Sequence, residues 1–539
     1  MITVSKRASV VTWTLLGLVV LGAAAVRLRL LDVPLNRDEG EYAYFGQLLL
    51  QGIPPYTTAY NFKLPGIYAV YAGILATFGQ TPTGVHLGLL VANIAGCTLT
   101  VLLATRLFTP TVAVLAGATF AVLSLNSRLH GLTAEAEHFG LLPALAGALA
   151  LLSAVESRRL RAFFASGVLF GLAFMTKQNG AAFVLFGVLY ALLRTAGARE
   201  GTGLVRRLAP SLVLLGGGLL PYGVLCLALA LVGAFENFWF WTTVYAYYYA
   251  SNLSLADGLT LFGLAFTSGA ILATTYLVVA LAAVGAAVLV WDRKVRSPGW
   301  FVGLFVLCSF AGTAAGLHFR PQYFLLLVPS VALLAGIAVD AAARGLRTRP
   351  PLLRIGVPLA LAVLPLAHLV YTERTVFFEL APERVARAIW GINPFPESIE
   401  IARYIKARTA EGDRIAVLGS EPEIYFYAHR PAATGFIYTY ALLENHRYAS
   451  HMQRQMISEI DAAKPKFVVV VNVRPSWLER SGAVDLGWLS PWWGQYHQDF
   501  ERVGVADIGL DRTTYAWGAD AIGYTAKSVS VDVFERKRR

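Results

Sequence analysis

The sequence has few charged residues and almost no cysteine. Asp, Glu, Lys and Arg make up only 14% of the 539 residues, whereas 56% are hydrophobic, and an average soluble domain is about one-quarter charged. A soluble fold could not cover so much apolar surface, so the composition excludes an ordinary soluble protein. The three cysteines, Cys97, Cys226 and Cys308, lie in apolar segments without paired spacing, so no disulfide or cysteine metal motif is predicted.

The net positive charge does not indicate a nucleic-acid partner. The formal charge is +12, but Lys and Arg are concentrated in short segments between long apolar stretches, which is the positive-inside pattern of membrane proteins. The sequence also lacks a nucleotide-binding glycine motif, convincing internal repeats and low-complexity segments. We therefore expect contact with membrane lipids and none with nucleic acid.

Long apolar stretches recur from Val10 to about Val370, and each is about twenty residues, enough to cross the hydrocarbon core of a membrane as a helix. The first follows Lys6 and Arg7 but has no clear small-residue cleavage site, so a retained helix is predicted rather than a signal peptide. The expected fold class is a mainly α, polytopic membrane helical bundle over residues 1–372. Hydropathy predicts about eleven spans, at 10–29, 84–107, 110–126, 138–155, 162–177, 179–194, 208–232, 259–290, 299–316, 323–343 and 354–372.

The basic segments predict an orientation. With a cytoplasmic N-terminus, all of the Arg- and Lys-rich connections lie inside, as the positive-inside rule requires. An odd number of spans then places the chain after residue 372 outside, together with the loops 30–83, 127–137, 233–258 and 317–322. The expected location is a multi-pass protein of the cytoplasmic membrane. Aromatic stretches in the loop 30–83 and at 235–249 are typical of segments that lie along the membrane surface.

The composition changes after about Pro394. A polar helix is predicted at 399–408, and apolar strands are predicted at 414–419, 466–473 and 529–534. A helix alternating with apolar strands favours a small α/β domain in the aqueous compartment. We therefore expect two parts, a membrane domain at 1–372 and an extracytoplasmic domain at 373–539.

A cluster of carboxylates follows the first predicted helix. The segment Asn36-Arg-Asp-Glu-Gly-Glu lies at the water–membrane boundary, where the bond between a sugar and a polyprenyl phosphate would also lie. Transfer of such a sugar needs a general base for the acceptor hydroxyl. Asp38 is the first candidate, and Glu39 is the neighbour that would tune its pKa or orient the acceptor. The alternative is that these residues only cap a surface helix.

The same chemistry needs cations for the departing phosphate. Lys63, His318 and Arg320 lie on the same predicted side, and ammonium and guanidinium groups suit phosphate oxygens. Each alone could instead extend to lipid headgroups. Lys177 interrupts an apolar stretch, where a charge is expected to be functional.

A second acidic cluster, Glu135, Glu137 and His138, lies at the start of the fourth predicted span. These side chains could bind the acceptor, pair with an Arg or hold a metal ion. A carboxylate and a histidine at this spacing recur by chance, so the pattern indicates a metal only weakly.

With these motifs in place, the chain resembles the GT-C integral-membrane glycosyltransferases, in particular the glycosyltransferase 39-like branch of protein O-mannosyltransferases and lipid A aminoarabinose transferases. The resemblance covers about residues 1–372. It is carried by Arg37-Asp-Glu-Gly-Glu-Tyr-Ala-Tyr, Lys63-Leu-Pro-Gly-Ile-Tyr, Thr133-Ala-Glu-Ala-Glu-His-Phe, Lys177-Gln-Asn-Gly and His318-Phe-Arg-Pro-Gln-Tyr.

This resemblance implies a hexosyl- or pentosyltransferase whose donor is one sugar linked to dolichyl or undecaprenyl phosphate, with inversion at the anomeric carbon. It implies that Asp38 is the catalytic base. The motif of Lys63 and the motif of His318, Arg320 and Tyr323 would contact the donor phosphate. The second-loop acids Glu135 and Glu137 would lie near the acceptor, which is a lipid, a polysaccharide or a protein.

The sequence departs from the family pattern at two positions. Leu64 replaces the first proline of a Pro-Pro pair found in many relatives, and Phe62 stands where some relatives have a carboxylate that helps bind a metal. We therefore predict no required cofactor or metal. The C-terminal region also lacks the repeated sugar-binding modules of eukaryotic relatives, so a protein acceptor is not implied.

Two other classes fit part of the pattern. A lipid-linked sugar flippase would also have many spans and a phosphate-binding cavity, but transporters often have inverted repeats and polar sites near the bilayer midplane. Here the polar residues gather at one face, together with an aqueous domain, which favours an enzyme. A non-catalytic scaffold that binds polyprenyl phosphate would not need Asp38.

Overall fold

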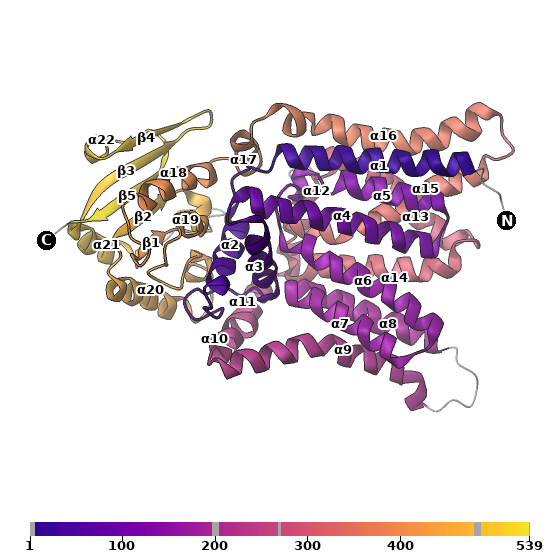
Figure 1. The fold of residues 1–539 in the computed structure, drawn as a ribbon, viewed down its shortest axis with the longest axis horizontal. Helices are drawn as coiled ribbons and strands as arrows, with labels where there is room; N and C mark the ends of the chain where they lie inside the picture. Colours follow the sequence, from indigo (N-terminus) through magenta and orange to yellow (C-terminus); the bar gives the residue numbers. More distant parts are fainter. Residues whose placement is uncertain (1–5, 197–203, 268–270, 479–486, 538–539) are drawn as a thin grey trace.

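The computed structural model describes residues 6–196, 204–267, 271–478 and 487–537. It has a bundle of long, roughly parallel helices and a smaller α/β domain beyond one end of the bundle (Figure 1). The N-terminus lies at the other end of the bundle (Figure 1). The predicted fold class, a polytopic helical bundle with a small C-terminal α/β region, is confirmed.

The bundle contains a helix at every predicted span. Among the described residues, eight helical segments are long and apolar enough to cross a membrane, and several shorter apolar helices lie beside them. The bundle helices are α1 (Lys6–Arg29), α4 (Pro82–Leu107), α5 (Pro110–Leu123), α6 (Ala136–Ser157), α7 (Leu160–Thr176), α8 (Ala181–Ala196), α9 (Leu204–Leu231), α12 (Leu255–Thr267), α13 (Ile271–Trp291), α14 (Arg296–Ala314), α15 (Val328–Gly345) and α16 (Val357–Thr372). The predicted single span 259–290 differs from the structure, because it coincides with two separate helices, α12 and α13.

Local sequence explains where two of these helices begin. Thr81 and Thr109 are the N-caps of α4 and α5, and each is followed by a proline in the first turn. The threonine hydroxyls accept hydrogen bonds from the backbone N–H groups of Gly84 and Val112. A threonine cap satisfies an amide that the helix leaves free, and the fixed φ of proline suits the first helical position.

The aromatic outer segments form short helices at the junction of the two parts (Figure 1). They are α2 (Arg37–Leu50), α3 (Gly66–Phe78), α10 (Phe235–Trp239), the π-helix Phe240–Tyr245 and α11 (Ala246–Ser251). Most residues of α2 are buried. It therefore does not lie on the surface as expected, because both of its faces pack against protein.

The C-terminal region contains a five-stranded mixed sheet with the order β1-β2-β5-β3-β4. Strands β1 and β2 are parallel, and the other pairs are antiparallel. The elements are α17 (Pro382–Trp390), α18 (Phe395–Lys406), β1 (Ile415–Leu418), α19 (Glu423–Ala428), α20 (Ala449–Ala463), β2 (Phe467–Asn472), α21 (Ser490–Tyr496), β3 (Phe500–Ile508), β4 (Thr513–Trp517), α22 (Ala519–Ile522) and β5 (Val529–Arg536).

The apolar core does not divide at the predicted boundary. One continuous cluster of buried side chains includes Tyr42 and Tyr68 of the outer helices together with Ile401, Val417 and Val469 of the C-terminal region. A second cluster joins the bundle to Phe377 and to the helix α17. The C-terminal sheet domain is therefore packed onto the outer loop of the bundle rather than tethered beside it.

Candidate active site

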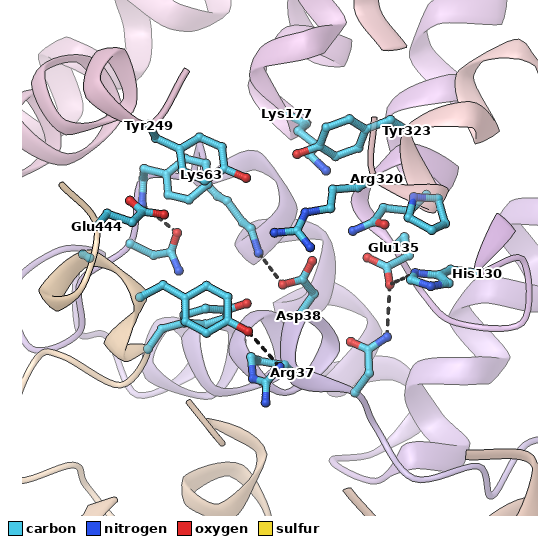
Figure 2. Close-up of a pocket in the computed structure, with 18 of the residues that line it drawn as sticks. Arg37, Asp38, Lys63, His130, Glu135, Lys177, Tyr249, Arg320, Tyr323 and Glu444 are labelled. Atoms are coloured by element: carbon cyan, nitrogen blue, oxygen red, sulfur yellow. Dashed lines mark hydrogen bonds and ion pairs between the residues drawn. The ribbon is translucent and has the colours of Figure 1, made fainter. Parts of the chain in front are cut away.

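A polar cavity of about 180 Å³ lies at the junction of the bundle and the C-terminal domain (Figure 2). All four predicted outer loops contribute to it, and so does the C-terminal domain. The lining comes from 36–38, 60–63, 130 and 135, 177, 241–249, 320–323, 390 and 395, and 438–444. Segments that are far apart in the sequence thus converge on one partly open cavity.

Asp38 lies in the first turn of α2 and faces this cavity. Asn36 is the N-cap of the helix, and its side chain forms a capping box with Glu39. The carboxylate of Asp38 accepts a hydrogen bond from Nζ of Lys63 at 2.9 Å, and its side chain is 20% exposed. Asp38 is therefore held by a cation and a helix N-terminus, both of which favour the ionised form, yet it remains accessible.

Lys63 is shared between two carboxylates. Its Nζ also donates to Oε2 of Glu41 at 2.9 Å, and the hydroxyl of Tyr68 donates to Oε1 of Glu41 at 3.0 Å. The ammonium group lies 4.6 Å from the ring centroid of Tyr42. Lys63 therefore stays charged within a fixed network.

The two carboxylates beside Lys63 titrate very differently. Burial alone would raise the pKa of Asp38, but the charges of Lys63 and Lys177 and the hydrogen bond from Lys63 lower it from 3.8 to about 2. Burial raises the pKa of Glu41 from 4.5 to about 7, and the attraction of Lys63 offsets this only in part. Asp38 is thus an anion at every physiological pH, whereas Glu41 changes charge near neutrality.

Glu39 points into the protein and binds neighbouring backbone and side-chain groups. It is not among the residues that line the cavity. Its Oε1 accepts a hydrogen bond from the backbone N–H of Ala134 at 2.6 Å and lies 3.1 Å from Nε2 of His86, while its Oε2 accepts the backbone N–H of Asn36. Glu39 therefore ties the start of α2 to the bundle, and a direct role at the acceptor stays a prediction.

Two further cations reach the cavity. Nζ of Lys177 pairs with Oε1 of Glu137 at 2.5 Å and lies 4.4 Å from the ring centroid of Tyr323. Arg320 points toward Asp38 (Figure 2). Within the described ranges, the Arg320 guanidinium forms no ion pair with a carboxylate of the chain. Arg320 is therefore the cation best placed to accept an anion from outside.

Glu135 faces the opposite side of Asp38 from Lys63 (Figure 2). Its Oε1 accepts a hydrogen bond from Nδ2 of Asn36 at 3.0 Å and lies 3.6 Å from Nδ1 of His130. Its Oε2 has no hydrogen-bond partner among the described residues, although the residue is only 1% exposed. The His130 ring lies 4.2 Å from the ring of Trp390. A buried acceptor atom without a donor is costly, so this corner suits a ligand that brings a hydroxyl.

Besides Glu39, two other predicted residues lie outside the cavity lining. His318 stacks on Tyr249 with ring centroids 4.3 Å apart, and its Nε2 lies 3.2 Å from the carbonyl oxygen of Tyr249. Glu137 is occupied by Lys177. They support the wall residues Tyr249 and Lys177, so any contact of their own with a donor or acceptor stays a prediction.

Sequence reasoning assigned no site to the C-terminal domain, yet Tyr438, Tyr440 and Glu444 line the cavity. The hydroxyl of Tyr245 in the π-helix donates a hydrogen bond to Glu444, which closes this wall. The aromatic run at 235–249 was the available signal for one side of it. Nothing in the local sequence around 438–444 indicates that this segment forms the adjoining part of the cavity wall.

The second acidic cluster is spread over different partners, because Glu135 faces Asn36 and His130 whereas Glu137 faces Lys177. The part of the chain that the structure describes contains no group of three or more His, Cys, Asp and Glu side chains that could hold a metal ion. The expectation that no metal is required remains a prediction, tested below with a chelator.

Comparison with known proteins identifies the fold. Residues 63–215 match the sequence model of the dolichyl-phosphate-mannose-protein mannosyltransferase family, and no curated protein sequence matches the chain. ArnT from Cupriavidus metallidurans, solved with undecaprenyl phosphate, is 17% identical with a TM-score of 0.56, over 85% of this chain and 92% of ArnT. The oligosaccharyltransferase AglB from Archaeoglobus fulgidus, solved with an inhibitory peptide and a dolichol-phosphate, is 11% identical with a TM-score of 0.53, over 96% of this chain and 75% of AglB.

The resemblance to the GT-C membrane glycosyltransferases is confirmed by the family model and by these two structures. The chain is a multi-pass membrane protein with the GT-C fold. In that fold, the cavity is lined by the ionised Asp38, by Arg320, which forms no ion pair with the described residues, and by Glu135, whose buried Oε2 has no hydrogen-bond partner among them.

Proposed function

We propose that this protein, a multi-pass membrane protein with the GT-C fold, is a glycosyltransferase that moves a sugar from a polyprenyl-phosphate donor to an acceptor hydroxyl. The observation that carries the proposal is that the anionic Asp38 and the cationic Arg320 face one cavity at the end of an apolar bundle. ArnT and AglB were solved with undecaprenyl phosphate and a dolichol-phosphate. These ligands support a lipid phosphate donor here.

The donor phosphate binds Arg320. A guanidinium fork matches two phosphate oxygens, and an arginine without a carboxylate partner gives up no ion pair when the phosphate enters. Lys63 and Lys177 add positive charge nearby, although each already pairs with a carboxylate. This arrangement holds the phosphate beside Asp38.

Asp38 acts as the general base in a single displacement. The acceptor oxygen attacks the anomeric carbon, its proton passes to the Asp38 carboxylate, and the bond from the anomeric carbon to the phosphate oxygen breaks with its electron pair on the phosphate. Arg320 and Lys63 stabilise the charge on the departing polyprenyl phosphate. A carboxylate of low pKa accepts the proton late, when the attacking oxygen has become acidic. One displacement inverts the anomeric configuration.

The orientation follows from the placement of charge and cavity. The cavity and the C-terminal domain lie at the end of the bundle opposite the N-terminus (Figure 1). The Arg-rich connections predict a cytoplasmic N-terminus. Transfer then takes place on the outer face of the cytoplasmic membrane, where a lipid-linked sugar and an envelope acceptor would meet.

The acceptor occupies the corner of Glu135, because the Oε2 atom of Glu135 receives no hydrogen bond from the residues that the structure describes and Trp390 offers a flat apolar wall. Replacing Glu135 with Gln should raise the acceptor KM roughly tenfold, since an amide presents only one oxygen acceptor and a weaker one than a carboxylate, while the donor KM stays within about twofold. Initial rates at varied acceptor and donor concentrations check this. Glu156→Gln, at the exposed end of the same helix, is the matched control. A change in the donor KM alone would contradict the assignment.

The pKa of Glu41 predicts a pH dependence of donor binding. As the pH rises through about 7, Glu41 ionises and offsets the charge of Lys63, while a phosphodiester keeps its single charge. The donor KM should therefore rise up to about tenfold from pH 6 to pH 8, and Glu41→Gln should be independent of pH in this range. Since the folded pKa is raised, the ionisation also lowers stability as the pH rises from 4.5 to about 7. A native donor KM that is flat with pH would contradict the prediction.

The decisive experiment measures transfer by purified protein from radiolabelled polyprenyl-phosphate sugars, with and without a chelator, against a panel of lipid, polysaccharide and peptide acceptors. Sugar transfer establishes the enzyme, and unchanged transfer in chelator shows that no metal is required. Absence of transfer with every donor, together with movement of the lipid-linked sugar across liposomes, would instead establish a flippase.

A further inference from the structure

The helix that carries Asp38 packs against two different parts of the protein. Arg37, Gly40, Tyr44 and Gln47 recur at helical spacing on one face of α2, and all four contact the C-terminal domain. Asp38, Glu41 and Tyr42 lie on the other side, toward Lys63. One face of α2 thus packs against the C-terminal domain, and the other faces Lys63 and the cavity.

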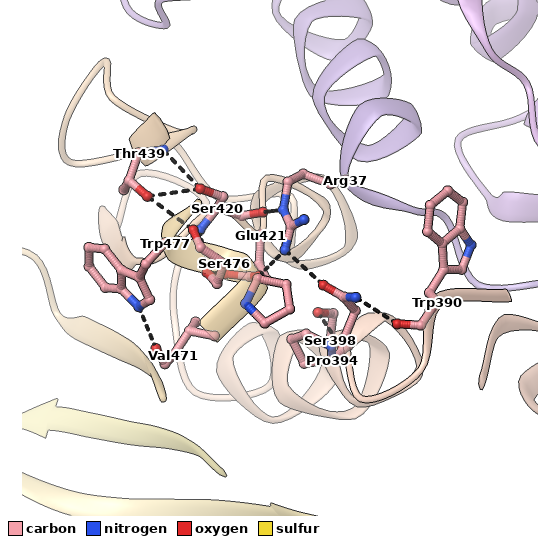
Figure 3. Close-up of polar contacts among 12 residues, drawn as sticks. Arg37, Trp390, Pro394, Ser398, Ser420, Glu421, Thr439, Val471, Ser476 and Trp477 are labelled. Carbon is pink, nitrogen blue, oxygen red and sulfur yellow. Dashed lines mark hydrogen bonds and ion pairs between the residues drawn. The ribbon is translucent and has the colours of Figure 1, made fainter. Parts of the chain in front are cut away.

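Arg37 is the strongest of these contacts (Figure 3). Its Nε donates to the backbone carbonyl of Ser420, and its two Nη atoms donate to Glu421 at 2.9 Å, Asn393 at 3.1 Å and the hydroxyl of Tyr440 at 3.2 Å. All three guanidinium nitrogens are therefore committed to the C-terminal domain. This separates Arg37 from Arg320, which forms no ion pair in the described part of the chain.

The partner of Arg37 is fixed in turn. Glu421 follows β1 and is fully buried. Its other oxygen accepts a hydrogen bond from Oγ of Ser476, which follows β2, and that Oγ accepts the backbone N–H of Ser420 (Figure 3). The residues that bind Arg37 and hold its partner Glu421 in place thus follow the carboxyl ends of the two parallel strands, which are rigid elements of the sheet.

Gly40 allows the closest approach. A Cβ at this position would lie 2.6 Å from Cβ, 2.7 Å from N and 2.8 Å from Cα of Glu423, and these atoms belong to the start of α19. Farther along the same face, the backbone N–H of Ala432 donates to the hydroxyl of Tyr44, and Gln47 donates to the carbonyl of Phe426. Any residue larger than glycine at position 40 would force the helix and the domain apart.

We infer that the C-terminal domain is a positioning element of the active site, which sets the rotation and depth of α2 through Arg37 and Gly40 and thereby aims Asp38. The inference rests on the proposed transferase function. A helix turns as a unit, so the face docked on the domain determines where the opposite face points. Misplacement of a reacting group by about 1 Å costs up to 100-fold in rate, so a proton acceptor on a short helix benefits from such a support.

The test uses two variants outside the cavity lining, in the full chain. Glu421→Gln removes the charge that holds Arg37, and Gly40→Ala inserts a methyl group against α19. Glu400→Gln, in the exposed pair with Arg403, and Gly73→Ala, where nothing lies within 4 Å, are the matched controls. Both test variants should lower kcat about 10- to 100-fold and leave donor affinity within about twofold, since Arg320 and Lys177 are unchanged. Both should speed amide hydrogen exchange in α2.

A double-variant comparison separates positioning from general damage. In an Asp38→Asn background no base remains to be aimed, so adding Glu421→Gln should change the residual rate by less than about twofold. An equal fractional loss in both backgrounds, a native kcat in both test variants, or donor affinity that weakens in step with kcat would overturn the inference. If the native protein transfers no sugar, the proposed function fails, and unchanged exchange in α2 of both variants would independently overturn the docking role.

Discussion

Replacement of Asp38 with Asn is expected to lower kcat by about 10²- to 10⁴-fold, the usual contribution of a general base, without weakening donor binding, because the loss of a negative charge beside Lys63 favours an anionic phosphate. Asparagine has the same shape but cannot take the proton of the acceptor hydroxyl. Lys63 keeps Glu41 as a partner, so the variant should fold. Single-turnover transfer of labelled sugar, with donor binding measured on the same preparation, checks both parts.

Asp257→Asn is the control for this substitution, because the hydrogen bonds of Asp257 with described residues are local, to Ser254. Native turnover in Asp38→Asn would reject Asp38 as the base. A second outcome would indicate a scaffold that only binds polyprenyl phosphate. In that case the native protein would transfer no sugar, and Asp38→Asn would keep the biological function of the protein. Loss of donor affinity in parallel with kcat would instead place Asp38 in phosphate binding.

Replacement of Arg320 with Gln is expected to weaken donor binding by about 100-fold, because two charge-assisted hydrogen bonds to phosphate are lost. The donor affinity of Arg320→Lys should lie between those of the native protein and Arg320→Gln, because an ammonium group keeps the positive charge but cannot bind two phosphate oxygens as the guanidinium group does. Arg320→Gln should melt close to the native temperature, because the half-buried Arg320 forms no ion pair with the described residues that the substitution would break. Equilibrium binding of a labelled polyprenyl phosphate measures the effect.

Arg374→Gln provides the matched control, because Arg374 is exposed just after the end of α16, outside the cavity lining, and its hydrogen bond and cation–π contact among the described residues are with the nearby Tyr371. Unchanged donor binding in Arg320→Gln would reject the phosphate assignment. A loss of acceptor affinity alone would move Arg320 to the acceptor side of the cavity.

The membrane bundle could be predicted because hydropathy is a local property. Each predicted span coincides with helix, and the predicted first, second and third C-terminal strands coincide with β1, β2 and β5. Strands β3 and β4 were missed. Glu501, Arg502 and Asp507 interrupt the apolar pattern of β3, and β4 is a partly exposed edge strand, so the period of two is weak in both.

The site was predictable only in part. The structure brings Asp38 and Lys63 of the predicted motifs into contact, and Arg320, Tyr323 and Glu135 also line the cavity, while the catalytic and binding roles of these residues stay predictions. His318 and Glu137 lie behind the wall, because a residue next to a helix end can point either way and sequence spacing does not show which. The contribution of Tyr438 and Tyr440 depends on docking of a domain that no local pattern reveals.

Glu39 and Glu41 show the limit of the sequence most clearly. Composition and motif by themselves determined a membrane protein with a carboxylate cluster after its first helix. They could not decide which carboxylate would join Asp38 at Lys63, because two positions on a helix differ by about 200° in direction. The tertiary structure decided for Glu41, since α2 is rotated by its contacts with a domain whose Glu421 lies 384 positions from Arg37 in the sequence. Hydropathy is a property of each residue in the sequence, whereas the direction of a buried side chain depends on all of the residues that pack around its helix.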